Sequence, residues 1–377
     1  MHFHVGLRGD RRPEWGHISE RMRALRPVYD IFLLYAGVPR GQDTDDVLEQ
    51  NTLRQIDGAT DVDRVVCLAL DHVWDPAGQP RSDLSDFWVS NDYVRHLRRL
   101  RPERVLFGAS VHPYRCDFKD RVSEAVDQGA VLLKWLPSAQ QFSLAEPRVR
   151  EALVFLATAK GGAPLPVLLH TGVEYAVPTT DERTRPWDYL SWGFWDRFAN
   201  YWRRSKWYLP DIPGVRQTLD RALDAGAVII LAHAGLPYFA AKAALLEHDD
   251  LPVVTEYLRR GPAVPSGAGL ALADLSACAT PFRRGYFKDL ARLPADRLLF
   301  GSDFPTPVFE LRADLAGAWR DFKAMVAGDF WRIVVPRDNP VNVNYRQLNH
   351  YFPGHPMFTN FAQRFLALDD RHPPEAG

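Results

Sequence analysis

The sequence predicts an α/β fold in which eight parallel strands and their helices close into a (β/α)8 barrel, also called a TIM barrel. Eight short apolar segments have the length of buried strands: residues 2–5, 64–70, 104–111, 131–136, 166–170, 228–233, 269–275 and 298–302. Near-continuous apolar runs are typical of parallel strands that are covered on both faces. Helical or loop sequence separates each run from the next. This alternation predicts a parallel sheet, and eight units favour its closure.

Gly-Ala pairs precede three of these runs, at Gly58-Ala59, Gly129-Ala130 and Gly226-Ala227. Glycine is favoured just past a helix end, where the backbone turns left-handed, so each pair predicts that a helix ends and a strand follows. We also expect helices over residues 14–25 and 47–56. An open doubly wound sheet is the rival fold, but no Gly-x-Gly-x-x-Gly motif follows an early strand.

One connection is much longer than the others. Residues 175–210 follow the fifth predicted strand and contain Trp187, Trp192, Trp195, Trp202 and Trp207. In a barrel this insertion would lie on the catalytic face, because it follows the C-terminal end of a strand. It is interpreted either as a lid over the site or as a satellite core or subunit contact. We expect a single domain over residues 1–377, with residues 339–377 as a C-terminal extension packed across the barrel.

The composition excludes several classes of protein. A formal net charge of -1 gives no overall field that would attract nucleic acid or an anionic membrane. Cys67, Cys116 and Cys278 are too few and too far apart for a disulfide framework, which fits a reducing cytoplasm. No signal peptide and no bilayer-spanning apolar run are recognised. We expect a cytoplasmic protein with a small-molecule substrate, and the aromatic insertion is compatible with a homodimer.

Polar residues occur where several predicted strands end, which is where barrel enzymes carry their active groups. His2 and His4 are two residues apart on one strand and therefore point to the same face. His170 and His233 end the fifth and sixth strands, and Asp303 follows the eighth. A closed barrel brings these side chains, and Lys134 on the fourth predicted strand, onto one rim. Each also has a simpler explanation, since a buried histidine is often satisfied by a backbone carbonyl and an aspartate often caps a helix.

The ordered set of motifs resembles the amidohydrolase superfamily, and more closely its amidohydrolase-related branch of metal-dependent hydrolases and decarboxylases. The matching pieces are His2-Phe3-His4, Leu169-His170-Thr171-Gly172, Ala232-His233-Ala234-Gly235, Gly301-Ser302-Asp303-Phe304-Pro305 and the closing Asp338-Asn339-Pro340. Each piece is weak alone, but the pieces run in the family's order over nearly the whole chain.

The resemblance implies one divalent metal ion, usually Zn2+, held by His2, His4, His170 and Asp303. Three imidazoles and a carboxylate suit zinc, although Mn2+ or Fe2+ also binds such nitrogen and oxygen ligands. Asp303 would also take a proton from the water. His233 resembles the family's histidine that orients the water or polarises the substrate, rather than a metal ligand.

Four further residues are candidates for binding substrate. Lys134, on the fourth predicted strand, is either a substrate-binding cation or part of a structural ion pair; the branch that this chain resembles does not use it to bridge two metals. His112 follows the third strand, as His72 follows the second. Arg8 follows the first strand and Arg183 lies in the insertion. These arginines are either ligands for a substrate carboxylate or solvated loop charges.

The first predicted strand departs from the family pattern. The family has an apolar strand and an acidic residue before its His-x-His pair, whereas only Met1 precedes His2 here. We therefore expect this strand to be frayed and to hold His2 and His4 loosely, with weaker metal binding than in a chain extended upstream.

These features favour a metal-dependent hydrolase that uses a metal-activated water to cleave a C–N or C–O bond of an amide, lactone or ester. Asp303 and His233 are its catalytic residues, with His233 stabilising developing charge. Non-oxidative decarboxylation of an aromatic or unsaturated carboxylic acid is the alternative, because related barrels perform it with the same ligands. A barrel that binds metal or ligand without turnover is the third possibility.

Overall fold

The computed structural model describes residues 2–24, 28–171, 177, 214–236, 250–260, 269–280, 283–306, 308 and 338–366. The aromatic insertion predicted over residues 175–210, apart from residue 177, lies outside this range, and so does Arg183.

The eight predicted strands form one parallel sheet in chain order. They are β1 (Phe3–His4), β3 (Val65–Leu68), β5 (Val105–Ala109), β6 (Ala130–Trp135), β7 (Val167–Leu169), β8 (Val228–Leu231), β9 (Leu270–Asp274) and β10 (Leu298–Leu299). The sheet closes where Phe3 forms a parallel bridge with Phe304. There the His4 amide donates to the Phe304 carbonyl at 2.9 Å, and the Asp303 amide donates to the His2 carbonyl at 2.8 Å. The predicted TIM barrel is confirmed.

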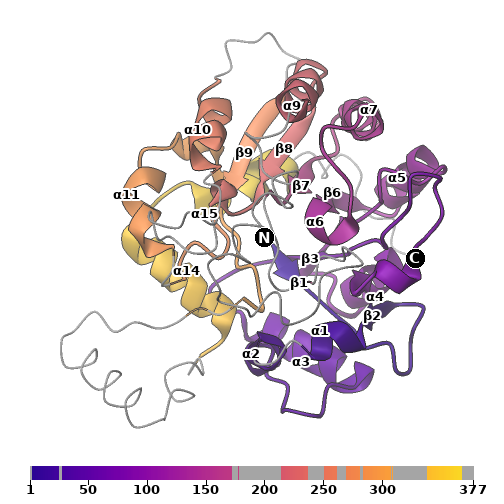
Figure 1. The fold of residues 1–377 in the computed structure, drawn as a ribbon. Helices are drawn as coiled ribbons and strands as arrows, with labels where there is room; N and C mark the ends of the chain where they lie inside the picture. The colour runs from indigo at the N-terminus through magenta and orange to yellow at the C-terminus, as the bar shows by residue number, and fades with distance from the viewer. Residues whose placement is uncertain are drawn as a thin grey trace, which may run out of the picture.

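Helices surround the strands (Figure 1). Those described are α1 (Glu20–Ala24), α2 (Val28–Tyr35), α3 (Asp45–Gly58), α4 (Asn91–Leu100), α5 (Phe118–Asp127), α6 (Pro137–Gln140), α7 (Pro147–Leu156), α9 (Val215–Asp224), α10 (Leu251–Arg259), α11 (Phe287–Leu290), α14 (Pro340–Tyr351) and α15 (Met357–Phe361). The helix predicted over residues 47–56 is confirmed as α3. Gly129 and Gly226 have φ angles of 81° and 96°, which is the left-handed turn expected before β6 and β8.

The single helix predicted over residues 14–25 is wrong. Residues Gly16–Ile18 form strand β2, which pairs antiparallel with β4 (Phe87–Val89), and α1 begins only at Glu20. Ile18 is buried and pairs with Phe87, and the side chains of both residues lie next to Gly6. A partner strand nearly seventy residues away in the chain supplied the backbone hydrogen bonds, and a local sequence pattern contains no information about such a partner.

The first strand is also better held than we expected. Phe3 and His4 pair with Cys67 and Leu68 of β3 on one side and meet the Phe304 region on the other. His2 and Phe3 are fully buried. The expected frayed strand is therefore wrong, because both edges of β1 have hydrogen-bonding partners.

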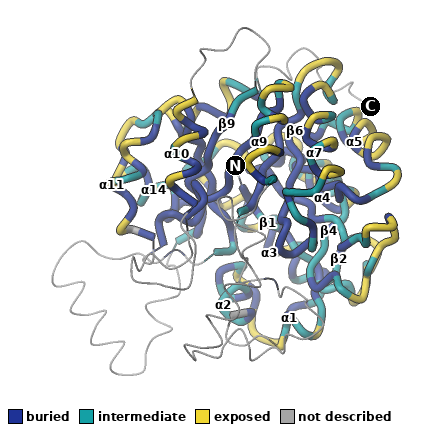
Figure 2. Tube along the Cα trace, turned by 45° about the horizontal axis from the view of Figure 1, so that its top comes forward, coloured by how far each residue is buried: buried dark blue, intermediate teal, exposed yellow. Residues whose placement is uncertain are grey.

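Two apolar layers stabilise the barrel. The interior layer contains alternate strand residues such as Val66, Leu68 and Ile230, together with Phe361 and Phe365 from the end of the described chain. The Asn360 side-chain amide donates to the Leu298 carbonyl at 2.6 Å, which places α15 at the starting end of β10. This end is opposite the one where His170 and His233 lie. Figure 2 shows the strands as buried and the outward sides of the helices as exposed.

Within the described residues, no helix combines the length and the apolar character needed to cross a lipid bilayer.

Candidate metal centre

Three of the predicted ligands meet where the barrel closes. The Nε2 atoms of His2 and His4 are 3.0 Å apart. Oδ1 of Asp303 lies 3.1 Å from Nε2 of His2 and 3.3 Å from Nε2 of His4. The backbone hydrogen bonds that close the barrel between residues 2–4 and 303–304 hold these side chains together. The same backbone hydrogen bonds therefore close the barrel and position the three side chains.

The histidines at the ends of β7 and β8 face the same place. The His233 ring stacks on the His2 ring at a centroid distance of 5.2 Å, and the His170 ring meets the His233 ring edge-on at 5.2 Å. Nε2 of His233 is 3.9 Å from Oδ2 of Asp303. The structure thus brings together five of the six residues that the sequence placed on one rim; the sixth, Lys134, is buried on β6.

The arrangement of atoms fits a small divalent ion. A tetrahedral zinc with ligand bonds of 2.0–2.1 Å has neighbouring ligand atoms about 3.3 Å apart. The His2, His4 and Asp303 atoms form a triangle with edges of 3.0, 3.1 and 3.3 Å. Ligand atoms of His2, His233 and Asp303 also lie within 4.8 Å of one another. The residues present therefore fit a metal ion.

Left-handed backbone is concentrated at this centre. His2, His233 and Asp303 have φ angles of 32°, 55° and 56°. Such conformations cost non-glycine residues on the order of 1–3 kcal/mol each and persist only where the surroundings enforce them. At His233 the enforcing contact is the backbone amide, which donates to Oδ1 of Asp274 at 3.0 Å.

Asp274 is a member of the centre that the sequence analysis missed. It ends β9, is fully buried, and has Oδ2 2.8 Å from Nδ1 of His2. Ser276 lies beside it, with Oγ 2.9 Å from Nδ1 of His2 and 2.8 Å from Nδ1 of His233. A signal was present in the sequence, since Leu-Ala-Leu-Ala-Asp ends an apolar run in a polar residue just as the strands before His170 and His233 do.

Three histidines of the centre, His2, His170 and His233, favour the neutral form of the imidazole. Burial, followed by the nearby charge of Lys134, lowers the pKa of His2 to about 3. Burial also lowers the pKa of His170 and of His233. Burial acts in the opposite sense on Asp303, but His233, His2 and His4 together hold the pKa of its carboxyl well below the usual range. Neutral imidazoles and an ionised carboxylate are the forms that bind a metal.

Lys134 lies in the barrel wall. Lys134 is buried on β6, and its charge lowers the pKa of His2, His170 and His233. The position of Lys134 is compatible with the predicted substrate-binding cation.

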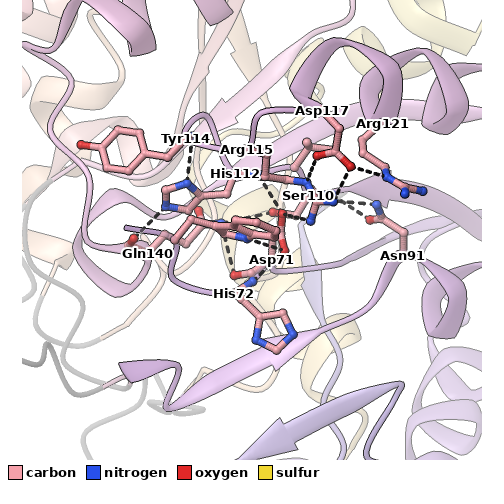
Figure 3. A network of polar contacts seen from close by, with 12 residues as sticks. Asp71, His72, Asn91, Ser110, His112, Tyr114, Arg115, Asp117, Arg121 and Gln140 are labelled. Carbon is pink, nitrogen blue, oxygen red and sulfur yellow. Dashed lines mark hydrogen bonds and ion pairs between the residues drawn. The ribbon is translucent and has the colours of Figure 1, made fainter. Parts of the chain in front are cut away.

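His112 belongs to a polar network that joins the segments after β3, β5 and β6 (Figure 3). Its Nε2 donates to the Gln140 carbonyl at 2.9 Å, and its Nδ1 accepts from the Tyr114 amide at 3.1 Å. Both ring nitrogens are engaged within the protein, and a contact between His112 and substrate stays a prediction. His72, in the same network, packs on the Trp88 ring at 4.0 Å. Arg8 is half-buried in the loop after β1. That it binds a substrate carboxylate stays a prediction.

His112 makes the folded protein sensitive to acid. Burial lowers its pKa from 6.5 to about 4. The unfolded chain therefore binds the proton at a higher pH, and the stabilisation present above pH 6.5 is lost as the pH falls towards 4. We expect His112→Gln to remove about 2 kcal/mol of the stability difference between pH 7.5 and pH 5. Urea unfolding at both pH values, with chelator in each sample, measures this difference. An unchanged difference would contradict the prediction.

Gly301 allows the close packing behind the centre. A Cβ atom at Gly301 would lie 2.8 Å from Cβ of Ser276 and 3.0 Å from Cβ of His2. We expect Gly301→Ala to lower the free energy of unfolding by about 1–3 kcal/mol, because the added methyl group overpacks this region. Gly285→Ala is the matched control, since nothing lies within 4 Å of a Cβ atom there. Urea unfolding that ranks the two variants equally would show that the packing is loose.

Comparisons with known proteins give structural similarities only. No family model matches the sequence, and no curated protein is similar to it. An uncharacterised TIM-barrel protein from Bordetella bronchiseptica is 14% identical, covers 93% of this chain and 97% of its own, and has a TM-score of 0.44. A 2,6-dihydroxybenzoate decarboxylase complexed with 2,6-dihydroxybenzoate is 16% identical over 93% of this chain and 99% of its own, at 0.44. A probable 2-pyrone-4,6-dicarboxylic acid hydrolase from Acinetobacter baumannii is 14% identical over 91% and 97%, at 0.40.

At identities of 14–16%, these likenesses concern the fold alone. These similar structures include both a decarboxylase and a hydrolase. With TM-scores below 0.5, they do not assign a reaction to this chain.

Proposed function

We propose that this chain is a metal-dependent hydrolase that cleaves a C–N or C–O bond of a small molecule, such as an amide, lactone or ester. The observation that carries the proposal is the triangle formed by Nε2 of His2, Nε2 of His4 and Oδ1 of Asp303. With His170 these residues would hold one divalent ion, most simply Zn2+. When bound, the ion would supply Lewis acidity and lower the pKa of a water from about 16 to about 7.

Asp303 would take the proton of the attacking water. One of its oxygens, Oδ1, faces His2 and His4, whereas Oδ2 accepts from the Thr306 hydroxyl at 2.7 Å and faces His233 at 3.9 Å. The ionised carboxylate accepts a proton as the water oxygen bonds to the substrate carbon. The same proton can then pass to the leaving oxygen or nitrogen when the C–O or C–N bond breaks.

His233 would orient that water. Nδ1 of His233 lies 2.9 Å from the Ser276 carbonyl, so this nitrogen carries the proton and donates it. Nε2, on the side facing Asp303, is then an acceptor that can receive a hydrogen bond from a water O–H. After protonation the same nitrogen becomes a donor to developing negative charge on the substrate. The tautomer thus favours water orientation first and charge stabilisation second.

Decarboxylation of an aromatic or unsaturated acid is the second candidate. The buried position of Lys134 beside the site histidines favours it. A buried cation whose charge acts on three site histidines would attract a substrate carboxylate. Lys134→Met tests this point, since it should raise KM for acidic substrates and leave KM for neutral esters unchanged. An equal effect on both classes would make Lys134 structural.

A substrate panel on the metal-loaded enzyme separates the reactions. New acid together with amine or alcohol from amides, lactones or esters supports the hydrolase. Release of carbon dioxide from aromatic or unsaturated acids would replace it with the decarboxylase. Bound metal without turnover on either set would favour a binding protein and overturn the proposal.

A further inference from the structure

Asp274 is a fully buried carboxylate whose hydrogen bonds connect two histidines of the centre. Its Oδ2 lies 2.8 Å from Nδ1 of His2. Its Oδ1 accepts hydrogen bonds from the backbone amides of His233 at 3.0 Å and Ser276 at 3.1 Å. The Ser276 hydroxyl also donates to Oδ1. One carboxylate on β9 therefore contacts His2, directly before β1, and His233, directly after β8.

The donors and acceptors around Asp274 admit one consistent assignment. An ionised carboxylate only accepts, so Nδ1 of His2 must be the donor to Oδ2. The single hydroxyl proton of Ser276 is used on Oδ1, so Oγ of Ser276 acts towards both histidines as an acceptor. Each Nδ1 then carries a proton, and each Nε2 presents a lone pair on the side of Asp303.

We propose that Asp274, with Ser276, is a positioning residue that fixes the tautomer of His2 and the backbone of His233, so that both Nε2 lone pairs face the metal centre. This role rests on the proposed metal site for its purpose, but the tautomer itself is a property of the metal-free chain. A carboxylate that accepts from the second nitrogen of a ligating histidine orients the ring and raises the basicity of the ligating nitrogen.

Asp274→Asn tests the proposal because it replaces one acceptor oxygen of the side chain by an NH2 donor and keeps nearly the same side-chain volume. The amide can present its oxygen to Nδ1 of His2 only if its NH2 group faces the amides of His233 and Ser276, which are donors too. The reverse orientation presents NH2 to Nδ1 of His2 and forces the proton onto Nε2. That proton would occupy the position of a metal ligand bond. Asp45→Asn is a matched control, since Asp45 is also fully buried and accepts backbone amides, from Gly9, Arg11 and Arg12.

The experiment uses the full chain labelled with 15N-histidine and freed of metal by chelator. Long-range 1H–15N correlation reports the tautomer of each histidine, and the His2 signals are identified by their loss in His2→Gln. We expect His2 to carry its proton on Nδ1 in the wild type and in Asp45→Asn, and on Nε2 in Asp274→Asn. Competition with a zinc chelator is expected to show about 10–100-fold weaker zinc binding for Asp274→Asn.

Several results would overturn the proposal. A wild-type His2 with its proton on Nε2 contradicts it without any variant, and so does an Asp274→Asn protein that keeps the Nδ1 proton. If Asp274→Asn does not fold, Ser276→Ala is used: it retains Asp274, so a His2 that loses its Nδ1 proton there would show that Asp274 does not fix it. A wild type with the expected tautomer but no zinc affinity would remove the proposed function and leave the tautomer assignment intact.

Discussion

Asp303→Asn is expected to lose both the metal ion and at least about 10^3-fold in kcat/KM. In the proposed mechanism the carboxylate has two functions that the amide cannot replace. Oδ1 faces His2 and His4 at ligand-pair distances, and Oδ2 would accept the water proton. A neutral amide is a poor ligand for zinc and has no basicity near neutral pH. The measurements are metal content and the rate on the best substrate of the panel.

Asp43→Asn is the control for this change. Asp43 is also buried and accepts a hydrogen bond from the Tyr29 hydroxyl at 3.0 Å, but it does not take part in the centre. We expect this variant to keep its metal and its rate. An Asp303→Asn protein that retains full activity would remove Asp303 from the mechanism.

His233→Asn is expected to keep the metal ion and to lose about 10^2–10^4-fold in kcat. Nε2 of His233 is 3.9 Å from Oδ2 of Asp303, which suits a shared water rather than a shared proton. Because the loss falls on the chemical step, KM should change much less than kcat. Parallel rate and metal measurements on His233→Asn and on His350→Asn, an exposed histidine on α14, provide the comparison.

Two outcomes would contradict this role for His233. Loss of the metal ion from His233→Asn would make His233 a ligand, a position that its distance from His2 and Asp303 allows. Unchanged kcat with metal retained would make it a structural residue of the barrel rim.

The barrel was predictable because its determinants are local. Each strand is a short apolar run, and the polar residue that ends it is adjacent in the chain, as at Leu169-His170 and Ala232-His233. In a closed parallel barrel, the ends of all strands meet on one face, so the order of these residues is enough to place them together. The rim of His2, His4, His170, His233 and Asp303 follows from this rule alone.

The features that the sequence did not predict depend on partners distant in the chain. Residues 16–18 became a strand because residues 87–89 pair with them. Nε2 of His112 donates to the Gln140 carbonyl, a bond that the position of His112 after a strand did not indicate. The contacts of Asp274 depend on how residues at the ends of β1, β8 and β9 are arranged in space, which the hydrophobic periodicity of the sequence does not specify.

Metal content by elemental analysis tests the central claim most directly. The wild-type chain and the His170→Ala/Asp303→Ala double variant are each freed of metal, reconstituted with Zn2+, Mn2+ or Fe2+, and freed of excess ion. The account predicts about one divalent ion per wild-type chain and almost none in the variant. A wild type that takes up no ion, or a double variant that binds as much as the wild type, would contradict a metal centre at these residues.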